Sequence, residues 1–285
     1  FFGWSRLQRS FSKIYYPKKI KDINLLNIEK VIARGSGLSY GDSALGKYVC
    51  SSKKLNKIIK FDKKKGTIEC ESGVTFNQIL ETIVKSGWFF HVTPGSSFAT
   101  IGGAIAADVH GKNHHIEGSF SDYLISFKLI KKNKIFNVNK KNKQLFRSTC
   151  SGMGLTGFIL SAKFKLKKIT SHLIVSKTKK FNTLGSLIKE IKLNFNSEYS
   201  VAWLDLIGNK NNKINSILYL GNHKRTSSEL KFRYKKQLNL SVLNKIIFLN
   251  DTIIKLFNYF YFNFSKKGET EVDLFKYFYP LDRIK

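Results

Sequence analysis

The stretch from residue 93 to residue 120 constrains the fold more than any other part of the chain. Residues 99–107 carry almost no bulky side chains, and glycines recur along the whole stretch. Such a surface lets backbone amides approach a ligand closely, which larger side chains would prevent. Three of the six histidines then follow within residues 110–115. This order predicts a cofactor-binding wall that runs into a reactive centre.

The composition indicates a globular protein and argues against a nucleic-acid reader. A chain of 285 residues with 42% hydrophobic residues is long enough for two domains. Its formal charge of +31 comes from 43 lysines and only 7 arginines, whereas nucleic-acid readers rely on arginine for bidentate contacts. We therefore expect solvated lysine-rich surfaces and no nucleic-acid partner, while a weak attraction to an anionic membrane stays open.

The cysteines predict neither a disulfide framework nor a metal site. Cys50, Cys70 and Cys150 are odd in number and widely separated. A reducing compartment fits this pattern. The N-terminus has no leader pattern, and no run of 18 uncharged apolar residues occurs. We therefore expect a cytoplasmic protein, with peripheral contact at the inner membrane left open.

Periodicity and turn residues predict mixed helices and strands, an α+β fold. A capping box formed by Thr75 and Gln78 opens one helix, and Gly87 ends it. Two domains are expected, 1–170 and 171–285. The other expected elements are a helix at 17–30, helices at 184–195 and within 242–264, and strands at 31–33, 55–61, 67–72, 123–130, 134–138, 158–169, 199–208 and 214–222.

Three glycine-rich loops each adjoin a predicted strand. The first spans residues 33–43, the second 93–111, and the third 151–157. The first offers successive backbone N–H groups as an anion nest, suited to a pyrophosphate. It matches neither GxGxxG at the start of a helix nor GxxxxGK[ST], so neither a Rossmann site nor a Walker loop is indicated. Together the three loops predict a long dinucleotide lying across one domain.

The histidines of the second loop have two readings. The spacing of His110, His114 and His115 is compatible with metal ligands, but no carboxylate set accompanies it. An acid–base role fits better, because histidine can take or give a proton near neutral pH. We therefore expect no metal site.

The three loops in this order, RGSGLSYGD, TPGSSFATIGGAIAADVHGKNHH and GMGLTG, resemble the FAD-binding oxidoreductases of the vanillyl-alcohol-oxidase type. HGKNHH with the downstream YSVAWLD (199–205) and FKYFYPLD (275–282) is similar to the decaprenylphosphoryl-β-D-ribose 2′-oxidase branch of that family. The resemblance implies a PCMH-type two-part FAD-binding domain followed by an α+β substrate (cap) domain. It also implies that the C-terminal part of the second domain is missing here, so that this chain would bind FAD weakly.

The resemblance further implies which residues bind FAD. The first loop would wrap the pyrophosphate, the second would line the flavin, and the third would reach the adenine end. The implied cofactor-binding residues are Ala33, Arg34, Gly35, Ser36, Gly37, Leu38, Ser39, Tyr40, Gly41, Asp42, Ser43, Gly95, Thr100, Ile101, Gly102, Gly103, Ala107, Asp108, Val109, His110, Gly157 and Ile159. Because Leu38 stands where some members carry a flavin-linking histidine, FAD is expected to be non-covalent.

The implied reaction is oxidation of a secondary sugar hydroxyl by hydride transfer to flavin. His110 and Tyr40 are the candidates that contact the reacting centre, with Lys112 as a cationic partner. The implied substrate is a polyprenyl-phosphate-linked sugar, whose keto product passes to a separate reductase. A soluble sugar-lactone or aldose oxidase and a non-catalytic basic binding protein remain as alternatives. Residues 242–264 read either as substrate-domain core or as an interfacial surface.

Overall fold

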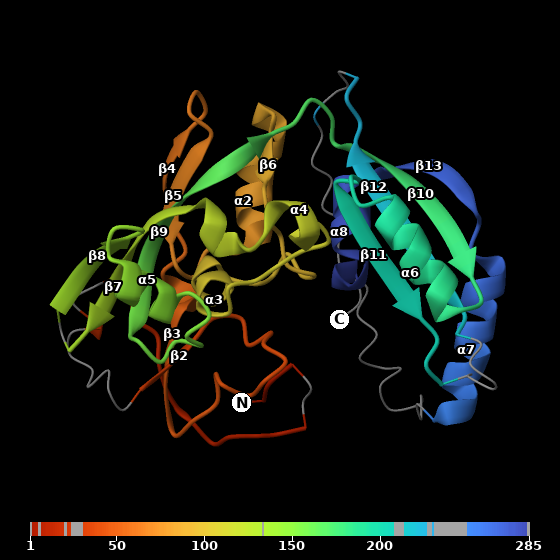
Figure 1. Ribbon diagram of the computed structural model, residues 1–285. Coiled ribbons are helices and arrows are strands. Elements are labelled where there is room, and N and C mark those ends of the chain that lie inside the picture. The colour runs from red at the N-terminus through yellow and green to blue at the C-terminus, as the bar shows by residue number, and fades with distance from the viewer. Residues whose placement is uncertain are drawn as a thin grey trace. The chain divides into compact units, whose positions relative to one another are not determined.

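The computed structural model describes residues 2–4, 7–19, 22–23, 31–132, 134–207, 214–226, 230 and 250–283. They form two compact units, whose elements are labelled in Figure 1. Unit 1 comprises Phe1–Gly111 and Glu117–Lys168, and unit 2 comprises Lys112–Ile116 and Ile169–Lys285. The five residues 112–116 therefore pack with the second unit, although they interrupt the sequence of the first.

The larger sheet of unit 1 is antiparallel and is built around β9. The strand order is β4-β5-β9-β7-β8, and β6 pairs with the C-terminal end of β9. The bounds are β4 Ile58–Asp62, β5 Thr67–Glu71, β6 Trp88–Phe90, β7 Leu124–Lys131, β8 Lys134–Asn139 and β9 Phe158–Lys168. The strands expected at 55–61 and 67–72 are confirmed as β4 and β5, which form a hairpin whose turn residue Gly66 has a φ of +60°.

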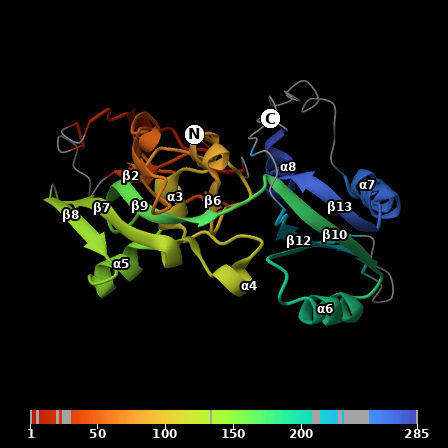
Figure 2. The ribbon, with the colours of Figure 1, turned by 90° about the horizontal axis from the view of Figure 1, so that it is seen from above.

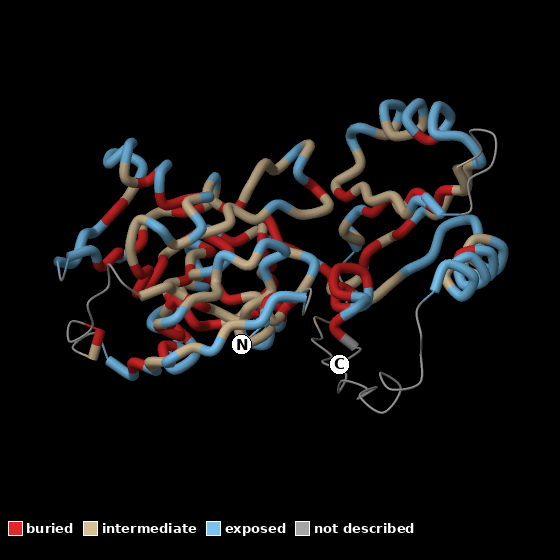
Figure 3. The backbone as a smooth tube through the Cα atoms, turned by 90° about the horizontal axis from the view of Figure 1, so that it is seen from below, coloured by how far each residue is buried: buried red, intermediate tan, exposed pale blue. Residues whose placement is uncertain are grey.

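A small parallel sheet packs against the larger one. Its order is β1-β3-β2, with β1 at Lys13–Tyr15, β2 at Ile32–Arg34 and β3 at Tyr48–Ser51. Buried apolar side chains from both sheets share one core cluster. Its members are Ile23, Cys50, Leu55, Ile130, Phe158 and Leu160. The buried stretches of unit 1 gather where the strands and α2 pack (Figure 3).

Helix α2 (Phe76–Ile83) confirms the predicted capping box. The Thr75 hydroxyl accepts a hydrogen bond from the Gln78 amide, and the Gln78 side chain accepts one from the Thr75 amide. A 3-10 turn, Val84–Ser86, continues the helix, and Gly87 ends it in the left-handed conformation. The apolar side chains of Phe76, Ile79, Leu80, Ile83 and Val84 lie on one face and are all buried, which holds α2 against the core.

Within the described ranges, the other helices are shorter than α2, apart from two in unit 2. The α-helices are α3 Ile101–Ala106, α4 His114–Glu117, α5 Lys143–Thr149, α6 Leu184–Leu193, α7 Asp251–Phe264 and α8 Leu274–Phe278. The 3-10 turns are Ser52–Lys54, Phe120–Tyr123 and Pro280–Arg283.

Unit 2 is a four-stranded antiparallel sheet with helices on both faces. Its order is β11-β12-β10-β13, with bounds Tyr199–Leu204, Ser216–His223, Leu173–Phe181 and Gly268–Asp273. Leu218 of β12 clusters with Leu187 of α6, whereas the next residue, Tyr219, hydrogen-bonds Tyr261 of α7. Since successive strand residues face opposite sides, α6 covers one face and α7 the other (Figure 2).

Some predicted elements differ from the structure. The helix expected at 17–30 is not seen at 17–19, residues 22–23 are helical, and residues 20–21 and 24–30 lie outside the described part of the chain. The strand expected at 199–208 ends at Leu204, and the carboxylate of the next residue, Asp205, accepts a hydrogen bond from the Asn258 side-chain amide at 2.7 Å. Of the segment 242–264, only residues from 250 onward are described, and they form α7.

Candidate functional site

The three glycine loops of unit 1 lie side by side. The Ser36 hydroxyl of the first loop donates to the Phe98 carbonyl of the second at 2.6 Å. Gly35 lies so close to the Thr100 hydroxyl that a side chain at this position would overlap it. The first and second loops thus meet at the start of α3, as a dinucleotide spread over the loops would require.

The third loop packs against the C-terminal end of α3. The Met153 amide donates to the Ala106 carbonyl at 2.8 Å, and the Ser151 amide donates to the Ile105 carbonyl at 3.2 Å. Gly154, with a φ of +80°, lies against the side chain of Ala33. The last turn of α3 therefore fixes the third loop next to the first.

The first loop keeps its backbone amides available. Among the described residues, the amides from Gly37 to Gly41 donate no hydrogen bond to the chain. A Cβ added at Gly41, or at Gly95 of the second loop, would meet no atom within 4 Å. Free N–H groups beside open space suit an anionic ligand such as a pyrophosphate. The free amides and the open space beside them therefore fit a bound dinucleotide.

The two charged residues of the first loop differ in their surroundings. The Arg34 guanidinium is buried and donates to the carbonyls of Ala44 and Phe2, at 3.1 and 2.9 Å. It also lies against Gly37, whose φ of +72° carries the backbone around it. The Asp42 carboxylate lies close to Gly3, and its Oδ1 is buried without a hydrogen-bond partner among the described residues. The contacts of Arg34 therefore support the loop, whereas those of Asp42 show no such role. Leu38, Ser39 and Ser43 lie at or near the surface.

The start of α3 is already saturated with hydrogen bonds. The amides of Ile101 and Gly102 donate to the carbonyls of Val74 and Ser72, and the Gly103 amide donates to the Thr100 hydroxyl. A ligand cannot use these donors without breaking the turn at 72–74. Gly102 is small because Ser72 packs on it, whereas Gly103 is exposed and presents a bare backbone surface.

The residues that follow α3 hold the next turn in place. Asp108 has a φ of +41°, and its carboxylate accepts hydrogen bonds from the Ser119 hydroxyl and from both the amide and the hydroxyl of Ser121. Ala107 ends α3, and the Val109 carbonyl accepts the Phe120 amide. Asp108 is therefore a structural anchor that positions the residue pair 109–110.

In the third loop, Gly157 has a structural reason to be glycine. Its φ is +149°, and a Cβ would run into the Ile130 carbonyl. Ile159 is buried in β9, where it pairs with Leu129. Its side chain therefore belongs to the core, and only the backbone near Gly157 stays within reach of a ligand.

The two proposed contacts to the reacting centre lie at the surface of unit 1. His110 is exposed at the end of the second loop, where its backbone bridges to Ser119. Tyr40 is 81% exposed, and its ring stands edge-on to Trp4 at 5.1 Å. His110 is accessible to a substrate, whereas Tyr40 has a neighbouring aromatic ring that explains its position without a substrate.

Lys112 belongs to unit 2. Its amine donates to the Phe278 carbonyl at 3.1 Å and lies 5.6 Å from the ring centroid of Tyr277. Burial lowers the pKa of Lys112 from 10.5 to about 8, because a desolvated ammonium is disfavoured. The amine therefore changes charge near the pH range in which most enzymes work. Burial also raises the pKa of the Tyr277 hydroxyl well above its usual value.

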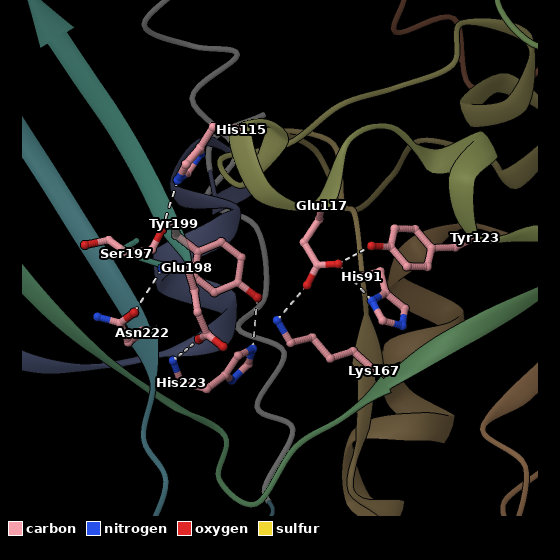
Figure 4. Close-up of polar contacts among 10 residues, drawn as sticks. All are labelled: His91, His115, Glu117, Tyr123, Lys167, Ser197, Glu198, Tyr199, Asn222 and His223. Atoms are coloured by element: carbon pink, nitrogen blue, oxygen red, sulfur yellow. Dashed lines mark hydrogen bonds and ion pairs between the residues drawn. The ribbon is translucent and has the colours of Figure 1, made fainter. Parts of the chain in front are cut away.

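Sequence patterns did not reveal a polar cluster in unit 1 around Glu117, which follows directly on the histidine motif (Figure 4). The Glu117 carboxylate accepts hydrogen bonds from Tyr123 and from Lys167, the latter at 3.0 Å, and contacts His91 Nδ1 at 3.2 Å. His91 stacks on Tyr123 with ring centroids 3.8 Å apart. The members come from the residue after β6, the end of α4, the 3-10 turn Phe120–Tyr123 and β9, so no local spacing could have indicated them.

The pKa values in this cluster follow from burial and pairing. Burial alone would raise the pKa of Glu117, but hydrogen bonds from Tyr123 and Lys167 outweigh it and hold the pKa below 4.5. Burial lowers the pKa of His91, which keeps the ring neutral despite its contact with Glu117. The pair formed by Glu117 and Lys167 thus carries the charge of the cluster.

A second polar group lies within unit 2 (Figure 4). His115 Nε2 lies 3.0 Å from the Ser197 carbonyl, and the Tyr199 hydroxyl lies 3.0 Å from His223 Nε2. The His223 amide donates to the Glu198 carboxylate at 2.6 Å. These contacts tie residues 112–116 and the ends of β11 and β12 together. Within the described ranges, no group of three or more potential ligands could hold a metal ion.

Residues 24–134 match the FAD binding domain family. A solved structure of an alkyldihydroxyacetonephosphate synthase superposes on 74% of this chain with a TM-score of 0.61 at 16% identity, and 46% of that structure is covered. This likeness shows the fold, a PCMH-type α+β arrangement. Over residues 24–134, the chain is therefore similar to the class of proteins that carry an FAD binding domain.

Within that class, the chain is 34% identical over 187 residues to the decaprenylphosphoryl-β-D-ribose oxidase of Mycolicibacterium smegmatis. The match covers 62% of this chain and 40% of the relative. A D-lactate dehydrogenase of Anaerostipes hadrus is 31% identical over 107 residues, covering 36% of this chain and 22% of the relative. The chain thus spans less than half the length of the relatives it matches.

Proposed function

We propose that this chain is the FAD-binding part, with a portion of the substrate-binding part, of an oxidase that acts on a secondary sugar hydroxyl. The observation that carries the proposal is the contact of the second and third glycine loops with Ala33, Gly35 and Ser36. These residues directly precede the free amides of Gly37–Gly41, within residues that match an FAD binding domain. Units 1 and 2 would serve as the FAD-binding and substrate domains, respectively.

The first loop would hold the FAD pyrophosphate through its backbone amides, and Gly95 and Gly103 would give the flavin room on the second loop. The bare backbone before Gly157 would face the adenine end. Because Leu38 offers no nucleophile for attachment, FAD would be held non-covalently.

When bound, the flavin supplies a hydride acceptor for the carbinol carbon of the substrate. His110 is the proposed general base, because it is exposed at the end of the second loop and imidazole accepts a proton near neutral pH. Lys112 would provide a cation, or a second proton acceptor, as its amine titrates near pH 8. Tyr40 would contribute a hydroxyl contact from the first loop.

The proposed substrate is the 2′-hydroxyl of a pentose carried on a polyprenyl phosphate. This choice of substrate rests on the 34% identity to a decaprenylphosphoryl-β-D-ribose oxidase. The keto sugar formed would be consumed by a separate reductase. A lipid-linked substrate suits peripheral contact at the inner membrane, and the three free cysteines suit a reducing compartment, so we place the enzyme on the cytoplasmic side.

The test begins with equilibrium dialysis of the purified chain against FAD, so that weak binding is also measured. We expect an excess of FAD on the protein side, with absorption bands near ~370 and ~450 nm that leave the protein on acid precipitation. Equal FAD concentrations on the two sides overturn the proposal for this chain.

The substrate is tested by anaerobic bleaching of the ~450 nm band, since a reduced flavin loses it. A polyprenyl-phosphate pentose is expected to bleach the band, and D-lactate and free aldoses are not. Bleaching by a free aldose instead would indicate a soluble sugar oxidase and overturn the lipid-linked substrate.

A further inference from the structure

Helix α7 of unit 2 carries an apolar stripe on its outward face. Its large apolar residues recur at spacings of three and four, which places them on one side of a helix. All are between 41% and 74% exposed, and they are Ile253, Leu256, Phe257, Phe260 and Phe264. Phe260 and Phe264 stack with ring centroids 5.7 Å apart. Figure 3 shows α7 as an almost continuously exposed coil.

The opposite side of α7 is fastened to the sheet by polar contacts. The Asn258 amide donates to the buried Asp205 carboxylate at 2.7 Å, and the Tyr261 hydroxyl lies 2.8 Å from that of Tyr219. The Trp203 ring stands edge-on to Tyr261 at 5.0 Å. These contacts fix the rotation of the helix, so the apolar stripe cannot turn inward without leaving buried polar groups unpaired.

The charges around the stripe favour an anionic partner. From residue 250 to residue 268, three lysines, Lys255, Lys266 and Lys267, accompany a single carboxylate, Asp251. All three lysines are exposed, and the whole chain carries a formal charge of +31. A second copy of this chain would bring equally basic surfaces together, whereas an anionic lipid surface would attract them.

We propose that α7 lies flat in the interface of an anionic lipid bilayer, with its apolar stripe among the acyl chains and its lysines near the headgroups. A helix of 14 residues is only about 21 Å long, too short to cross the hydrocarbon core but suited to lying in the interface. No described helix is long and apolar enough to span a membrane. The proposal does not depend on the oxidase reaction, because it rests on this helix alone.

The test is a flotation assay of the whole chain with two kinds of vesicle, phosphatidylcholine alone and equal parts phosphatidylcholine and phosphatidylglycerol. The wild-type chain is expected to bind the anionic vesicles. The variant Phe257→Gln/Phe260→Gln is expected to bind them at least about tenfold more weakly, because two aromatic side chains no longer enter the acyl region.

A matched control removes two exposed apolar residues from α6, Leu184→Gln/Leu193→Gln. This control is expected to bind as the wild type does. Equal binding by the wild type and the α7 variant would overturn the proposal, since the attraction would then be one of charge alone. The proposal is also overturned if the wild type binds neither kind of vesicle and sediments as a dimer that the α7 variant disrupts. The apolar stripe would then be the contact with a second copy of the chain.

A second measurement reports insertion directly and does not depend on a loss of binding. Phe260→Trp is expected to gain fluorescence that brominated phosphatidylcholine in the anionic vesicles quenches, relative to the wild-type background. Leu193→Trp on α6 is expected to show no added quenching. Equal quenching of the two tryptophan variants, or no quenching of either, would contradict insertion through α7.

Discussion

At the scale of single residues, the glycines of unit 1 divide into two kinds that sequence cannot separate. Gly35 is glycine because Thr100 packs against it, and Gly157 is glycine because of its φ of +149° and the neighbouring Ile130 carbonyl. Gly41 and Gly95 have neither constraint. A glycine that the fold itself does not require is a candidate for a position reserved for a ligand.

This distinction predicts that Gly95→Val separates cofactor binding from stability. Because a Cβ at this exposed position meets no atom within 4 Å, the melting temperature of the FAD-free protein should hardly change. A side chain filling the space of the flavin should weaken FAD binding by about tenfold or more. Gly185→Val, at another glycine with open space, is the control. Unchanged FAD affinity in Gly95→Val would remove the second loop from the cofactor site.

Lys112 predicts a pH-dependent stability. Its pKa falls from 10.5 to about 8 in the folded chain, so the unfolded chain binds more protons between these values. Stability should therefore rise with pH across this window, by at most about 1.4 kcal/mol per pH unit, relative to Lys112→Met. Urea unfolding of both proteins from pH 7 to pH 10 measures it. A constant difference between them would show that the amine is not desolvated.

At the scale of elements, local signals gave reliable predictions where they were complete within a few residues. The Thr75–Gln78 box and Gly87 delimit α2 and its 3-10 extension as expected. Strand β13, GETEVD, was not predicted, because a polar edge strand has no apolar alternation. The Glu117 cluster likewise assembles groups that lie up to 76 residues apart in sequence, from His91 to Lys167.

The Glu117 cluster predicts a measurable loss of stability. Glu117→Gln removes the ion pair to Lys167 and weakens the hydrogen bonds from Tyr123 and His91. We expect a loss of about 1–3 kcal/mol in the free energy of unfolding at pH 7, since the carboxylate is largely buried.

The loss should shrink as the pH falls below 4.5. The folded pKa of Glu117 is depressed, so its contribution exists above the ordinary carboxyl pKa and disappears as the folded carboxyl is protonated. Glu271→Gln is the control, because its ion pair with Lys224 is half exposed and should contribute less than about 1 kcal/mol. Equal effects of the two substitutions would mean that the cluster adds nothing beyond a surface ion pair.

At the scale of the whole molecule, the sequence predicts two successive domains, whereas the chain crosses between its units three times. Residues 112–116 leave the first unit, pack in the second, and return. The Lys112 carbonyl accepts the Ser200 amide at 2.7 Å, and His115 contacts the Ser197 carbonyl. Unit 2 therefore depends on a segment that lies more than fifty residues ahead of its main part.

This crossing predicts that residues 169–285 alone are less stable than the same residues preceded by 112–116 on a flexible Gly/Ser linker. The short segment supplies the partners of Ser197, Ser200 and Phe278, and without it these groups face water. Thermal unfolding of the two fragments, followed by circular dichroism, measures the difference. Identical transitions would show that residues 112–116 contribute nothing to unit 2.

The sequence by itself determined the local features of this protein, which are the capped helix, the Gly66 turn and the glycine loops, because each depends on backbone preferences over a few neighbouring residues. The FAD-binding class came from the resemblance that the loop motifs carry. Only the tertiary structure decided which glycines stay open, which unit holds Lys112, and which face of α7 points outward. These outcomes depend on contacts such as Asn258 with Asp205, whose partners meet only after the chain has folded.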